Sequence, residues 1–106
     1  MKYIGIIGNG KIGRAVASLL RSENFKVVVA DSVEGPDVIQ LDGTNPQQVE
    51  KFIRDKDGIV SCGPYFINMV IAEQCAKLNK AYFDPTEDTE IAEYVSSCTN
   101  KETMMT

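Results

Sequence analysis

Residues 2–21, KYIGIIGNGKIGRAVASLLR, decide the fold of this 106-residue chain. An apolar run ends at Gly8, and from Lys11 the apolar residues return at helical spacing, so the stretch predicts a strand, a tight turn and a helix. Between the strand and the helix, residues 8–13 match the pattern G-x-G-x-x-G.

Each glycine of this pattern has a physical task in that context. Gly8 allows the tight turn, Gly10 leaves the backbone open to a pyrophosphate, and Gly13 lets the helix pack closely on the first strand. The helix start adds free N–H groups and positive dipole. We therefore predict cofactor binding by Gly8, Asn9, Gly10, Lys11, Ile12 and Gly13. The alternative is a plain strand-turn-helix with incidental glycines.

Farther along, short apolar runs alternate with amphipathic stretches, a pattern typical of parallel strands joined by helices. Further strands are expected at 26–30, 38–41, 58–61 and 81–83, with helices opening at Pro46, over 66–78, and from Thr86 or Asp88 to Val95. The expected fold class is α/β, a three-layer Rossmann-type doubly wound parallel sheet of about five strands in the order 3-2-1-4-5. The first helix is expected to cover the sheet with Ile12, Ala15, Val16, Leu19 and Leu20.

The link between the second and third strands is unusually short. Six residues separate Asp31 from Val38, whereas a crossover between parallel neighbours takes about a dozen or more. The second crossover helix is therefore expected to be missing or reduced to one turn, and Gly35 and Pro36 agree with a bent loop.

Asp31 ends the second strand 18 residues after Gly13. An acidic group about 20 residues beyond the glycines takes the adenosine ribose hydroxyls in dinucleotide sites, so we predict that Asp31 and the adjacent Ser32 contact the cofactor. A carboxylate there repels a 2′-phosphate, and no arginine occurs between Asp31 and Arg54. NAD is thus preferred, with NADP as the second choice. The alternative is that Asp31 is a solvated strand-end residue.

Other predicted site residues follow the third and fourth strands. Asp42 and Gly43 are expected near the adenine, although turn chemistry also explains them. The loop after the fourth strand should line the crevice at the switch point, and it comprises Ser61, Cys62, Gly63 and Pro64. Because the chain has no histidine, nothing visible supports a Cys62 thiolate, and a packed or lining cysteine is favoured. No catalytic or metal-ligating residue is assigned.

Composition excludes several classes of protein. The net charge is -4 and the 11 basic residues are scattered, which argues against nucleic acid as a partner. No apolar run approaches the roughly 20 residues of a membrane span. The 3 cysteines include no C-x-x-C pair, which predicts neither a disulfide framework nor a zinc site and fits a reducing cytoplasm.

The stretch DGIVSCGPYFINMVIAEQCAKLNKAYFDPTED, residues 57–88, carries a family resemblance. Together with the glycine loop and residues 41–43, it resembles the amino-terminal NAD(P)-binding domain of the saccharopine dehydrogenase and lysine 6-dehydrogenase family. The resemblance implies an oxidoreductase that acts on the amine of an amino acid, with cofactor held by Gly8, Gly10, Gly13 and Asp31, and with residues 61–64 near the nicotinamide half.

The resemblance also implies that the chain is one part of an enzyme. Residues 1–98 are expected to form the dinucleotide-binding domain and residues 99–106 a polar tail, while the family's substrate domain is absent from the chain. The chain alone is therefore not expected to turn over a small-molecule substrate. We hypothesise that the isolated domain forms a homodimer through surfaces that the absent part would cover.

Two other classes of function remain open. NAD-sensing regulatory modules of potassium-transport systems resemble the same strand-turn-helix, strand-end acid and Asp-Gly turn, but residues 63–65, Gly-Pro-Tyr, favour a dehydrogenase. An interaction protein built on a decayed nucleotide fold is the third class, and the presence of all three motif glycines together with Asp31 argues against it.

Overall fold

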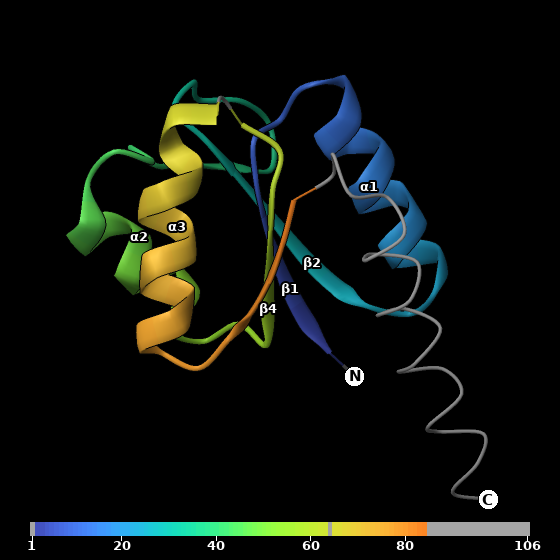
Figure 1. Ribbon diagram of the computed structural model, residues 1–106. Helices are drawn as coiled ribbons and strands as arrows, with labels where there is room; N and C mark the ends of the chain where they lie inside the picture. The colour runs from blue at the N-terminus through green and yellow to red at the C-terminus, as the bar shows by residue number, and fades with distance from the viewer. Residues whose placement is uncertain (1, 64, 85–106) are drawn as a thin grey trace, which may run out of the picture.

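The computed structural model describes residues 2–63 and 65–84. Within them the elements are β1 (Tyr3–Ile7), α1 (Lys11–Ser22), β2 (Lys26–Asp31), β3 (Val38–Gln40), α2 (Pro46–Ile53), β4 (Gly58–Ser61), α3 (Tyr65–Lys77) and β5 (Ala81–Phe83). The strands form one parallel sheet in the order β3-β2-β1-β4-β5, with α1 on one face and α2 and α3 on the other (Figure 1). The predicted doubly wound Rossmann-type sheet is thus confirmed.

Several predictions concern residues outside the described ranges, most of them at the carboxyl terminus. The helix expected up to Val95, the domain boundary at residue 98 and the tail at 99–106 lie outside the described residues, as does Pro64. In the part of the chain that the structure describes, no helix is long and apolar enough to cross a membrane.

The strand register brings the loops that follow the strands to one edge of the sheet. In the centre, Ile7 at the end of β1 pairs with Ala30 of β2 and with Ser61 of β4. At the next position outward, Asp31 at the end of β2 pairs with Gln40 of β3. Because all the strands are parallel, the residues after β1, β2, β3 and β4 meet at this carboxyl edge, which is where open α/β sheets bind ligands.

Helix α1 presents a different face to the sheet from the one predicted. Its buried residues are Gly13, Ala17 and Leu20, whereas Ile12 is 59% exposed and Leu19 is 49% exposed. The reason is the close packing of Gly13, because a helix that turns position 13 inward also turns positions 17 and 20 inward. The prediction that Ile12, Ala15 and Leu19 cover the sheet was therefore wrong, since all three are exposed.

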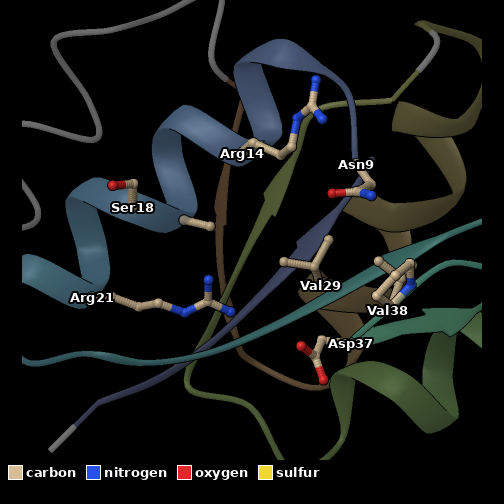
Figure 2. A pocket seen from close by; sticks show the side chains of 9 residues that line it. Asn9, Arg14, Ser18, Arg21, Val29, Asp37 and Val38 are labelled. Carbon is tan, nitrogen blue, oxygen red and sulfur yellow. The ribbon is translucent and has the colours of Figure 1, made fainter.

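The short link between β2 and β3 contains no helix, as predicted. It is a bent loop in which Asp37 adopts a left-handed conformation, with φ 57, and Val38 N–H donates to the Gly35 carbonyl oxygen at 3.2 Å. Without a helix at this place, a hollow of about 350 Å³ lies between α1 and the β2–β3 side of the sheet (Figure 2). Its lining residues are Asn9, Arg14, Ala17, Ser18, Arg21, Val29, Pro36, Asp37 and Val38.

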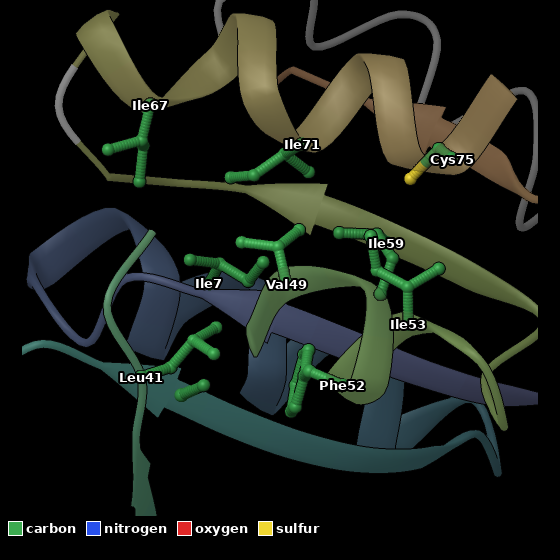
Figure 3. Close-up of a cluster of buried hydrophobic side chains, with 10 residues drawn as sticks. Ile7, Leu41, Val49, Phe52, Ile53, Ile59, Ile67, Ile71 and Cys75 are labelled. Atoms are coloured by element: carbon green, nitrogen blue, oxygen red, sulfur yellow. The ribbon is translucent and has the colours of Figure 1, made fainter. Parts of the chain in front are cut away.

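Two apolar clusters hold the layers together, one on each face of the sheet. Alternation along β1 divides them, since Ile4 and Ile6 belong to the α1 side and Ile7 to the side of α2 and α3. The cluster under α2 and α3 is the larger (Figure 3), and it consists of Ile7, Ala30, Leu41, Val49, Phe52, Ile53, Ile59, Ile67, Ile71 and Cys75. Helix α2 begins as predicted, with the Asn45 side chain accepting from the N–H groups of Gln47 and Gln48.

Helix α3 offers a matched pair of variants for testing this core. Ile71 is completely buried, while Met69 on the same helix is 83% exposed. Ile71→Ala should lower the free energy of unfolding by about 2–5 kcal/mol, because the lost methylene groups leave a cavity. Met69→Ala should change it by about 0.5 kcal/mol or less. Urea unfolding followed by circular dichroism measures both values, and equal effects would contradict the described packing of α3.

Candidate functional site

A crevice lies at the carboxyl edge of the sheet, where the loops after β1, β2, β3 and β4 meet. Its lining residues are Ile7, Gly8, Asp31, Ser32, Leu41, Asp42, Gly43, Thr44, Gly63, Phe66 and Ile67. Six of the predicted site residues, Gly8, Asp31, Ser32, Asp42, Gly43 and Gly63, are among them. The crevice holds about 220 Å³, whereas pockets for small molecules hold about 300–1,000 Å³, so it suits one part of an elongated ligand.

The first and last glycines of the loop are required by the fold. Gly8 has φ +117, and a Cβ atom there would lie 2.6 Å from the Cys62 carbonyl carbon. A Cβ atom at Gly13 would overlap the carbonyl oxygen of Gly8. Both positions therefore exclude a side chain whether or not a ligand is present.

The middle glycine is different, because nothing in the fold requires it. Gly10 is the N-cap of α1 with φ -82 and ψ -167, an extended conformation open to any residue, and its Cβ would have no neighbour within 4 Å. Among the described residues no side-chain hydrogen bond caps this helix, and its first turn holds no acidic residue. The first N–H groups of α1 therefore stay available to an anion, in contrast to α2, where Asn45 takes that place.

Asp31 is fixed beside the glycine loop by backbone donors. Its Oδ2 accepts from Asn9 N–H at 2.6 Å, and its Oδ1 accepts from Val33 N–H at 3.0 Å and from the Ser32 hydroxyl at 3.3 Å. The hydrogen bond from Asn9 is the main reason that the pKa of Asp31 lies below its ordinary value. The half-buried side chain is thus a carboxylate at neutral pH, in a fixed orientation.

Asp42 and Gly43, which follow β3, also line the crevice. The exposed Asp42 carboxylate accepts from the Thr44 N–H at 3.0 Å and from the Thr44 hydroxyl at 2.6 Å, which lowers the pKa of Asp42. These bonds are the turn chemistry that was the alternative explanation of this segment. Gly43 lies so close to α3 that a Cβ atom would be 3.0 Å from Ile67 Cδ1.

The loop after β4 enters the crevice through Gly63. Ser61 is buried and its hydroxyl donates to Asn68 Oδ1 at 2.6 Å, so this side chain turns toward α3 and is not among the described residues that line the crevice. Burial raises the pKa of the half-buried Cys62 thiol to about 12, and the charge of Asp84 adds to this shift. A thiol with this pKa is a poor nucleophile at neutral pH.

The remaining predicted residues lie beside the crevice instead of in its wall. Asn9 lines the neighbouring hollow, and Lys11 and Ile12 are exposed at the start of α1. Sequence reasoning missed Phe66, which lines the crevice and is 67% exposed. A signal for it exists in the sequence, because Phe66 lies in the first turn of α3 but outside the apolar stripe formed by Ile67, Ile71 and Cys75.

Comparison with known proteins agrees with this geometry. The model of the family described as "Saccharopine dehydrogenase NADP binding domain" matches residues 4–105. Saccharopine dehydrogenase (L-Glu forming) from Saccharomyces cerevisiae is a similar structure, with TM-score 0.72 and 20% identity over 79% of this chain and 21% of that one. A short-chain dehydrogenase/reductase superfamily protein from Agrobacterium tumefaciens with bound NAD has TM-score 0.66 and 14% identity over 77% of this chain and 31% of that one.

A third similar structure is UDP-N-acetylglucosamine 4-epimerase from Bacillus cereus, with TM-score 0.66 and 15% identity over 77% of this chain and 36% of that one. These identities show a shared fold only, and the chain spans well under half the length of each of the three proteins. No match was found among curated protein sequences. The family match extends over nearly the whole chain, so the chain belongs to the saccharopine dehydrogenase NADP-binding-domain family and is a binding domain for a nicotinamide dinucleotide.

Proposed function

We propose that the chain is the cofactor-binding part of an oxidoreductase that acts on an amino acid or an amine. One observation carries the proposal: the uncapped start of α1, the fixed carboxylate of Asp31 and the crevice at Gly43 and Gly63 meet at one edge of the sheet. A bound nicotinamide dinucleotide would supply hydride transfer to or from the substrate carbon that bears nitrogen. The protein residues bind and orient that cofactor.

Each part of the edge suits one part of a dinucleotide. The free N–H groups of α1 and the open space at Gly10 fit the pyrophosphate. The Asp31 carboxylate fits the adenosine ribose hydroxyls, and Asp42, Gly43 and Ser32 fit the adenine side. Gly63, with its neighbours Cys62 and Pro64, is assigned to the side toward the nicotinamide. The charge of Asp31 supports NAD over NADP as the preferred cofactor.

The reaction itself requires residues that this chain is not expected to contain. The chain spans 21% of the yeast saccharopine dehydrogenase, so no substrate-binding or proton-transfer group is assigned to it. An NAD-sensing module would share the same binding site, and family membership favours the dehydrogenase. The cysteine usage supports a cytoplasmic location, which stays a prediction.

Gly10→Val tests the site without disturbing the fold. The valine would extend into the space that the pyrophosphate should occupy, and the backbone at Gly10 is ordinary for any residue. We expect NADH affinity, measured by calorimetric titration, to fall at least tenfold. Valine is a poorer N-cap residue than glycine, so the melting temperature should fall, but by no more than about 6 °C, and the protein should stay folded. Folded wild-type protein that binds neither NADH nor NADPH would refute the proposed function.

Phe66→Ala tests the aromatic wall of the crevice. Stacking of a base on an aromatic ring is worth about 1–3 kcal/mol, so the variant should bind NADH at least about fivefold more weakly. Phe66→Trp should restore affinity, and its fluorescence should respond to the cofactor because the chain has no other tryptophan. Met69→Ala is the matched control, since Met69 is exposed on the same helix outside the crevice. Equal losses in both alanine variants would remove Phe66 from the site.

Self-association of the isolated domain stays a hypothesis, and exposed apolar side chains support it. Ile12 and Leu19 on α1 and Phe66 and Met69 on α3 are all at least 49% exposed. Contiguous patches of such residues mark surfaces where another protein packs, so a pair on one helix, such as Ile12 and Leu19, is the place to test. Sedimentation equilibrium should show a mass that rises with concentration, and Leu19→Lys should reduce this rise. A monomer at all concentrations up to about 0.5 mM would end the hypothesis, because only a dimer with a dissociation constant in the millimolar range escapes detection there.

A further inference from the structure

One side of α1 carries apolar side chains that are open to solvent. Ile12 is 59% exposed and Leu19 is 49% exposed, and the half-buried Val16 lies between them on the same side of the helix. We call these three residues the apolar flank of α1. Arg14 and Arg21, which line the hollow, lie on the opposite side, because each is two positions, or about 200° of rotation, from a residue of the flank.

The apolar flank faces the half of the sheet that β4 and β5 form. The hollow lies on the β2–β3 side of α1, so the opposite side of the helix turns toward β4 and β5. Val60 of β4 belongs to the apolar cluster on the α1 side, and Phe83 of β5 packs against it. Among the described residues, α1 is the one helix on this face, whereas α2 and α3 share the other (Figure 1). Because parallel sheets have both faces covered by helices, a second helix is expected over β4 and β5.

The chain itself supplies a segment that starts at the right place. Strand β5 ends at Phe83, at the carboxyl edge of the sheet where α1 begins. Beyond it the sequence predicts a helix, in which Ile91, Val95 and Cys98 recur at the i, i+4, i+7 spacing of one helix side. A helix over residues 88–98 would be about 16 Å long, close to the length of about 18 Å for the 12 residues of α1.

Charge favours the same pairing. Residues 2–84 include 10 basic and 10 acidic side chains, whereas residues 85–106 include 1 basic and 5 acidic ones, so the net charge of -4 lies entirely in the last part of the sequence. Helix α1 has three basic residues and no acidic residue. A second copy of α1 would therefore bring like charges together, while the acidic segment brings opposite charges together.

We propose that residues 88–98 pack as a helix on the apolar flank of α1 in the same molecule, above β4 and β5. Tethering favours this occupant, because a short connection gives a segment an effective concentration in the millimolar range. A second copy, which the self-association hypothesis places on the same flank, must reach that concentration in solution. The packing does not depend on cofactor binding, and it would complete the layer of helices on this face.

Nuclear Overhauser effects (NOEs) between methyl groups of the full chain test the contact directly. We expect NOEs from Ile91 or Val95 to the apolar flank, because packed side chains approach within about 4.0–4.5 Å. A mixture of isotope-labelled and unlabelled chains shows which contacts form between molecules. The expected NOEs should be missing from the intermolecular spectrum of that mixture.

Hydrogen exchange of the full chain gives a second readout with a matched control. The amides of residues 90–96 should exchange at least about tenfold more slowly than in an unstructured chain, because packing protects a helix from local opening. Leu19→Lys should remove most of this protection, since it places a charge within the flank. Met69→Lys is the control, because Met69 is 83% exposed on α3 at the other face of the sheet, and it should leave the protection unchanged.

Three results would overturn this packing. NOEs from Ile91 or Val95 to Met69 would place the segment on the α3 face. NOEs to the apolar flank that occur only between molecules would make a second copy the occupant. Unprotected amides in residues 90–96, without NOEs to α1, would leave the flank uncovered. None of these results bears on the proposed function, which NADH titration tests separately.

Discussion

The backbone of α1 rests directly on the turn that follows β1, and the rest of the structure depends on this contact. It exists because Gly13 has no side chain, since a Cβ atom there would overlap the Gly8 carbonyl oxygen. Gly8 in turn packs on the Cys62 backbone. The two contacts join β1, α1 and the loop after β4 at one point. They therefore fix both the rotation of α1 and the position of its free N–H groups at the carboxyl edge.

The short link between β2 and β3 is the second constraint, and it acts on the same edge. With no helix in this link, one side of α1 stays uncovered and the hollow with Arg14 remains open. The link also keeps the residues after β2 close to the glycine loop, where Asp31 accepts from Asn9 and Val33. The hydrogen bond between Asn9 and Asp31 lies between the hollow and the crevice, because Asn9 lines the hollow and Asp31 lines the crevice. The β2–β3 link therefore contributes to the shape of both spaces.

Local patterns sufficed to predict the strands, their order and the missing crossover helix. The observed bounds of β4 and β5 are the predicted ones, because Gly, Asp and Pro residues end short apolar runs sharply. The rotation of α1 was not predictable in this way. Apolar residues occur on both sides of this helix, and the packing of Gly13, a contact between backbones, decides that Leu20 turns inward while Leu19 stays exposed. Phe66 was missed for a related reason, since its place in the crevice depends on which loops meet in space.

On the proposed function, the choice of cofactor depends on a negative charge that the fold holds in one place. Asp31 ends β2 and is held as a carboxylate by backbone donors, so its charge is a fixed property of the loop. On the proposed function, this carboxylate sets the preference for a free 2′-hydroxyl over a 2′-phosphate. Its donors come from the glycine loop, through Asn9, and from the β2–β3 link, through Val33. The backbone segments that meet at the carboxyl edge therefore also hold the charge that discriminates between the two cofactors.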